Sequence, residues 1–199
     1  MKTPKKPALV RATALRGYAG LVARHGEAPE RLARLADLPP VYFRHPEVYL
    51  HFASFARLLD LSARATGPRM LGAELGDLQG LSAFGEFDPG SVIPTGASLR
   101  QAIELLRESL LQHSFVSDLR LSRSGDHALL SIALEQPASP GDGQAIEHAV
   151  ATGIRAMKTF YGPSWGPNQV IFQHRGPAGT TMPDGSAHPQ WCGVPARYG

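Results

Sequence analysis

The chain has 199 residues, of which 43% are hydrophobic and 19% are charged. This composition is typical of a globular protein and excludes a disordered or fibrous chain. No apolar run approaches the roughly 20 residues that a membrane-spanning helix needs. We therefore expect no membrane partner.

The formal net charge of +3 has a local origin. Lys2, Lys5 and Lys6 account for the excess, because residues 7–199 carry 17 basic and 17 acidic side chains. We expect a basic flexible tail at residues 1–7, followed by one domain at residues 8–199. No later segment has the dense cluster of Lys and Arg that binding to phosphates requires.

The N-terminus and the cysteine usage bear on the cellular compartment. The first residues lack the unbroken apolar segment and the cleavage site of a secretory signal. Cys192 is the only cysteine, so no internal disulfide can form. Both features predict a cytoplasmic protein.

Apolar residues recur at helical spacing through the first third of the chain. The pattern predicts a helix over residues 8–24, which Gly26 ends, and a short helix that Pro29 opens. The strongest helical pattern covers residues 47–65, and a shorter helical piece follows at residues 69–75. This part of the chain is therefore expected to be a run of helices.

The rest of the chain mixes helices and strands. Residues 76–97 contain five glycines and two prolines, which predict an irregular crossover. Ser98 and Gln101 have the spacing of a capping box at the start of a helix over residues 98–112. Alternating residues on both sides of the turn at residues 124–126 predict a β-hairpin with one buried face. A helix over residues 144–161 and a strand over residues 168–174 follow.

This order of elements predicts an α+β fold, in which an N-terminal helical run is followed by a small antiparallel sheet with packed helices. The sequence has no phosphate-binding loop, dinucleotide fingerprint or nucleophile elbow, so an enzyme is not expected. The histidines lack metal-ligand spacing, so neither a metal nor a cofactor is expected.

Candidate ligand-binding residues flank the junctions between the helices and the irregular segment. An effector site combines apolar walls with a few polar groups, and His51 lies beside the apolar stripe of its expected helix. For each aromatic candidate the alternative is core packing. The candidates are Tyr42, Tyr49, His51, Phe52, Arg69, Phe84, Glu86, Phe87 and Phe115.

Six segments, in order, resemble one family. They are VRATALRGYAGLVARHG, FASFARLLDLSARATGP, MLGAELGDLQGLSAFG, SLRQAIELLRE, MKTFYGPSWGPNQVIFQHRGPA and WCGVPARYG. Together they resemble the N-terminal arabinose-binding-type domain of AraC-family transcription regulators, over residues 8–199. Residues 85–96 depart from the family's more direct connection into the next helix.

The resemblance implies a bacterial regulator that binds a small-molecule effector and forms a homodimer. In the family, a DNA-binding domain with two helix-turn-helix motifs follows, so DNA is expected to be contacted only through that domain, which this chain lacks. The alternative is a stand-alone small-molecule or haem-type sensor, or an interaction module, without a DNA-binding domain.

Overall fold

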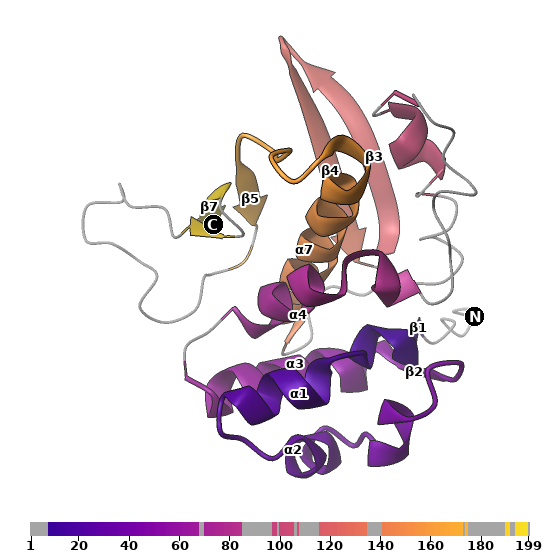
Figure 1. Cartoon of the computed structure of the whole chain (residues 1–199), viewed down its shortest axis with the longest axis vertical. Helices are drawn as coiled ribbons and strands as arrows, with labels where there is room; N and C mark the ends of the chain where they lie inside the picture. The colour runs from indigo at the N-terminus through magenta and orange to yellow at the C-terminus, as the bar shows by residue number, and fades with distance from the viewer. Residues whose placement is uncertain are drawn as a thin grey trace, which may run out of the picture.

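Figure 1 shows the arrangement of the elements in the computed structural model. The α+β class is confirmed: the first helices lie at one end, the β3–β4 hairpin at the other, and helices α4 and α7 between them. The structure describes residues 8–67, 70–84, 97–98, 100–105, 107, 116–134, 141–172, 174, 190–191 and 194–198. The expected tail at residues 1–7 lies outside this part of the chain.

Residues 8–67 form a unit of short elements, called here the N-terminal unit. Its elements are β1 (Leu9–Arg11), η1 (Ala12–Leu15), α1 (Tyr18–Arg24), α2 (Pro29–Leu35), η2 (Pro40–Phe43), β2 (Tyr49–His51) and α3 (Phe52–Ala65). Gly26 has the left-handed φ of +82° expected after a helix, and Pro29 begins α2 as predicted.

The prediction of one helix over residues 8–24 is wrong, although the burial it implied is right. Val10, Tyr18 and Val22 are buried as the helical spacing required. However, Val10 pairs with Leu50 in the antiparallel β1–β2 ladder, and Gly17 has a φ of +78° before α1 begins. Pairing with a strand 40 residues away overrides local helical preference, which no local pattern reveals.

The same ladder shortens the predicted helix over residues 47–65. Residues 49–51 form β2, so α3 begins only at Phe52. His51 therefore precedes the helix and is exposed, instead of lying beside its apolar stripe. The cause is the hydrogen bonding of β2 to β1, which supplies backbone partners that a helix would otherwise provide.

The first part of the expected crossover at residues 76–97 is regular structure instead. Helix α4 (Leu71–Gln79) and the 3₁₀ helix η3 (Gly80–Phe84) occupy its first part, and residues 85–96 lie outside the described residues. Gly72 and Gly76 lie within α4 where it packs closely on α7 (Asp142–Tyr161). This packing offsets the low helix propensity of glycine.

The capping box and the hairpin are confirmed. Ser98 N donates to Gln101 Oε1 at 2.9 Å and Gln101 N donates to Ser98 Oγ at 3.3 Å, and residues 100–105 are helical. Strands β3 (Val116–Ser124) and β4 (His127–Leu134) pair across a turn at residues 125–126.

Only part of the hairpin's inner face is buried, contrary to expectation. Leu119 is 5% exposed and packs in a cluster with Ile103 and Met157. Leu130, on the same face, is 41% exposed. The reason is that the hairpin extends past the end of α7 (Figure 1).

The C-terminal part adds a third sheet to the β1–β2 and β3–β4 pairs. The predicted strand at residues 168–174 contains β5 (Val170–Phe172), which pairs in parallel with β7 (Val194–Tyr198). Strand β6 (Gln190–Trp191) pairs with β7 in antiparallel fashion. This sheet is therefore mixed, with strand order β5-β7-β6.

Candidate functional site

Helices α4 and α7 make the most extensive helix–helix contact among the described elements, and glycine makes it possible. A Cβ atom added at Gly72 would overlap the carbonyl oxygen of Gln144. One added at Gly76 would overlap the carbonyl oxygen of His148. The two backbones therefore touch directly, and this fixes the register in which α4 side chains face α7 side chains.

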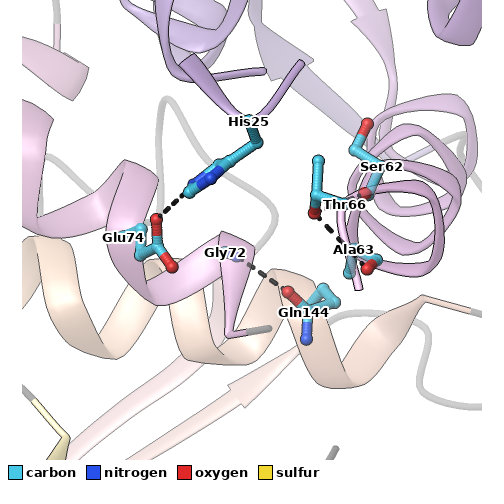
Figure 2. A network of polar contacts seen from close by, with 7 residues as sticks. All are labelled: His25, Ser62, Ala63, Thr66, Gly72, Glu74 and Gln144. Atoms are coloured by element: carbon cyan, nitrogen blue, oxygen red, sulfur yellow. Dashed lines mark hydrogen bonds and ion pairs between the residues drawn. The ribbon is translucent and has the colours of Figure 1, made fainter. Parts of the chain in front are cut away.

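A row of polar contacts begins at the first turn of α4. Gly72 N donates to Gln144 Oε1 at 2.8 Å, as Figure 2 shows, and Gln144 Nε2 donates to Glu147 Oε2 at 3.1 Å. The Glu147 side chain is fully buried, and its Oε1 lies 3.7 Å from His174 Nε2, just beyond β5. The His174 side chain is 25% exposed, so the row leads from a buried carboxylate toward solvent.

A second contact ties α4 to the N-terminal unit. His25, at the end of α1, places Nε2 2.9 Å from Glu74 Oε2 (Figure 2). Nearby, Thr66 Oγ1 donates to the carbonyl oxygen of Ser62 at 2.9 Å, at the end of α3. His25 and Gln144 thus each contact the first turn of α4, and α3 also packs against α4.

A third contact lies at the other end of α4. Gln79 Nε2 donates to the carbonyl oxygens of Ala14 at 2.9 Å and Arg16 at 2.6 Å, and its Oε1 lies 2.7 Å from His148 Nε2. The His148 ring also meets the Phe55 ring edge-on, with centroids 5.4 Å apart. Burial lowers the pKa of His148 from 6.5 to about 4, so its imidazole is neutral at pH 7.

These side chains form what we call the polar junction: His25, Glu74, Gln79, Gln144, Glu147, His148 and His174, with the Gly72 amide. The junction supplies two carboxylates, amides and imidazoles, which can bind hydroxyl, amine or amide groups of a small molecule. Within the described residues, no group of three or more His, Cys, Asp or Glu side chains is placed to hold a metal ion.

Four of the predicted binding residues lie in the N-terminal unit, two on the outer face of β2 and two in or against its core. Tyr49 and His51 lie on the outer face of β2, where Tyr49 is 42% exposed. Arg11 Nε donates to the Tyr49 hydroxyl at 3.0 Å, and the guanidinium lies 5.4 Å from the ring centroid. Phe52 is 3% exposed and belongs to the core of the N-terminal unit, on which half-buried Tyr42 also packs.

The other predicted residues cannot be placed in this way. Arg69, Glu86, Phe87 and Phe115 lie outside the described residues, and Phe84 is described only as the last residue of η3. The predicted site therefore stays a prediction.

Sequence reasoning missed the polar residues of the junction. Glu147 and His148 lie at helical spacing from buried Ala151 and Ile154, so both polar residues fall on the apolar face of α7. A charged residue at a core position was the available signal, since such residues are buried only when paired. Gln79 offered no such signal, because the glycines around it indicated a loop.

Comparison with known proteins identifies the family. The profile described as the arabinose-binding domain of AraC transcription regulator, N-terminal, matches residues 26–199. The chain belongs to this family. It is a regulatory domain of the AraC type, and the matched residues include the whole polar junction except His25.

Two curated relatives are similar to this AraC-type domain. They are the HTH-type transcriptional regulators VirS of Mycobacterium tuberculosis strains CDC 1551 / Oshkosh and ATCC 25618 / H37Rv. Each is 28% identical over an alignment of 169 residues, and the match covers 83% of this chain and 49% of the relative. The chain thus spans about half the length of these relatives. Among the described residues, no helix is long and apolar enough to cross a membrane.

Proposed function

We propose that this chain is the sensing part of a bacterial DNA-binding regulator, that it binds a small polar effector, and that it forms a homodimer. Membership of the AraC-type family supports the regulatory role. The similarity to two HTH-type regulators that are about twice as long supports DNA contact through a separate domain. In such an arrangement two half-sites on DNA favour a two-fold dimer.

The observation that carries the effector proposal is the burial of Glu147. A carboxylate at 0% exposure costs folding free energy unless polar groups surround it, and here Gln144 contacts it and His174 lies close by. His174 is the partly exposed member of this group and is next to solvent. We place the effector at the Gln144–Glu147–His174 end of the polar junction, with Glu147 accepting its hydrogen bonds.

Native mass spectrometry of the purified chain, compared with its denatured mass, tests this proposal. We expect a dimer that carries an additional small-molecule mass. The variant Glu147→Gln keeps the shape of the side chain but replaces the carboxyl group with an amide, and we expect it to lose that mass. Glu104→Gln, at a carboxylate that is 62% exposed, is the matched control and keeps the mass.

The predicted residues on β2 give the competing site. Retention of the bound mass in Glu147→Gln, with its loss in Tyr49→Ala, would move the effector to the outer face of β2. If the wild-type chain carries no mass, a thermal-shift screen of metabolites against wild type and Glu147→Gln replaces the first readout. A metabolite that stabilises both equally contradicts the role of Glu147.

A further inference from the structure

Strand β4 presents an exposed and uncharged edge. Its first five residues, His127–Ser131, are all exposed, and Leu129 and Leu130 are 50% and 41% exposed. Among the described residues β4 pairs with β3 alone. Isolated two-stranded hairpins are marginally stable in water, so a partner for this part of the hairpin is expected on physical grounds.

The two strands of the hairpin differ in the charged residues that prevent another strand from pairing with them. Edge strands usually carry charges or proline, which prevent another strand from adding. Strand β3 carries Asp118, Arg120 and Arg123, whereas the β4 sequence HALLSIAL contains no Lys, Arg, Asp, Glu or Pro. The edge of β4 therefore lacks the residues that would prevent another strand from pairing with it.

The position of the hairpin also leaves the exposed half of β4 accessible to another molecule. Its inner face is covered by Met157 of α7 and Ile103 near Leu119, but its tip extends beyond α7 to the far end of the molecule (Figure 1). The exposed half of β4 therefore lies away from the N-terminal unit and from the polar junction. A strand from another molecule can approach it without displacing these elements.

We propose that the His127–Ser131 segment of β4 is the dimerisation edge of this protein, and that its occupant is the same segment of a second copy. The two hairpins then form one antiparallel sheet in the order β3-β4-β4-β3. This inference rests on the dimer in the proposed function and names its surface.

The charge pattern favours a second copy paired through β4. Pairing through β3 in a register centred on Arg120 or on Arg123 would bring that arginine against its own copy, which is unfavourable. Pairing through β4 leaves the charged β3 strands as the two outer edges. Because both outer edges carry charged residues, no further strand adds to them, and the assembly stops at the dimer instead of growing into a filament.

Symmetry also restricts the register. With a two-fold axis perpendicular to the sheet, residues that face each other must point to the same side, so odd-numbered residues face odd-numbered ones. Leu130 then joins the inner face of the combined sheet, continuing the surface of Ile132. Leu129 and Ser131 meet their counterparts on the outer face.

Sedimentation velocity over a concentration series tests the proposal with two matched variants. Leu129→Arg places a bulky charge on the proposed edge, close to its own copy. Ser122→Arg places the same side chain directly across the ladder from Leu129, on the same face of the hairpin but on β3. We expect Leu129→Arg to raise the dimer Kd by about tenfold or more and Ser122→Arg to leave it unchanged.

Disulfide cross-linking provides a readout that does not depend on destabilising the dimer. In a Cys192→Ser background, cysteine is introduced in turn at positions 127, 129 and 131, and at 122 as control. We expect oxidation to link two chains at one or more of the three β4 positions and not at 122. Far-UV circular dichroism of each variant checks that the fold is retained.

The outcomes separate this inference from the proposed function. A wild-type dimer that persists in Leu129→Arg, or that Ser122→Arg weakens equally, overturns the β4 assignment while the proposed dimer stands. A wild-type chain that is monomeric in the concentration series overturns both the β4 assignment and the proposed dimer. Retention of the bound effector mass by a monomeric Leu129→Arg variant shows that sensing is independent of this edge.

Discussion

His148 Nε2 and Gln79 Oε1 lie 2.7 Å apart, between two buried side chains. Because Gln79 Nε2 already donates to two carbonyl oxygens, its Oε1 must act as the acceptor in this contact. The neutral imidazole of His148 therefore carries its proton on Nε2, and Nδ1 is the unprotonated nitrogen. A single glutamine thus joins η1, α4 and α7.

Replacing Gln79 tests how much this contact contributes. In Gln79→Leu, the carbonyl oxygens of Ala14 and Arg16 and the His148 N–H lose their partner. We expect a loss of about 3 kcal/mol or more in the free energy of unfolding, measured in urea, since each buried unsatisfied group costs about 1–3 kcal/mol. Gln101→Leu, at the exposed capping box, is the control, with an expected loss of about 1 kcal/mol. Equal losses in the two variants would contradict the assignment.

The depressed pKa of His148 predicts a specific dependence of stability on pH. The unfolded chain takes up a proton near pH 6.5 and the folded chain near pH 4, so the unfolded state binds more protons between these values. The contribution of the neutral His148 to the free energy of unfolding is therefore fully present above about pH 6.5. It is lost as the pH falls toward 4, by on the order of 3 kcal/mol.

The variant His148→Gln isolates this contribution. It removes the titrating group and keeps a donor that can reach Gln79. We expect the wild-type free energy of unfolding to fall more steeply than that of the variant between pH 6.5 and pH 4. His127→Gln, at an exposed position on β4, is the matched substitution. Parallel curves for wild type and His148→Gln would rule out the buried neutral imidazole.

Glycine to alanine changes should have opposite signs on the two helices. At Gly72 and Gly76 the added methyl group overlaps α7 backbone, and we expect each variant to lose at least about 2 kcal/mol. Gly153, within α7, has open space at the Cβ position, so Gly153→Ala should gain about 0.5–1 kcal/mol from helix propensity. Chemical denaturation measures all three, and a stable Gly72→Ala would show that α4 is free to move away.

The buried hydrogen bond between Tyr18 and Ser62 predicts different costs for removing its donor and removing its acceptor. Ser62 Oγ donates to the carbonyl oxygen of Leu58 at 2.7 Å, so the Tyr18 hydroxyl donates to Ser62 Oγ, also at 2.7 Å. Ser62→Ala leaves a buried hydroxyl donor without its acceptor and should cost about 2 kcal/mol. Tyr18→Phe removes that donor and should cost about 1 kcal/mol. Thermal unfolding of both variants shows which loss of stability is larger. A larger loss in Tyr18→Phe would mean that Ser62 is the donor and Tyr18 the acceptor.

The elements that sequence predicted best are those with local determinants. Ser98 and Gln101 satisfy each other within one turn, and Pro29 and Gly26 act through their own backbone preferences. The β1–β2 ladder, by contrast, joins Val10 to Leu50. Local periodicity contains no information about such a partner, so the chain looked helical on both sides of the ladder.

The candidate site was harder to predict for a related reason. Aromatic residues such as Phe52 suit both a core and a pocket, and the structure places this one in the core. Glu147 and Gln79 become functional candidates only when α4 and α7 pack together. That contact depends on Gly72 and Gly76, which in sequence indicate a loop as readily as a close helix crossing.

The direct backbone contact between α4 and α7 has a mechanical consequence. Because no side chains separate the two helices at Gly72 and Gly76, sliding of one along the other would force backbone atoms to collide. The 20-residue α7 is about 30 Å long and reaches from this contact to the cluster beneath the β3–β4 hairpin. We therefore expect α4 and α7 to move as one rigid pair, together with the Met157 cluster that α7 carries.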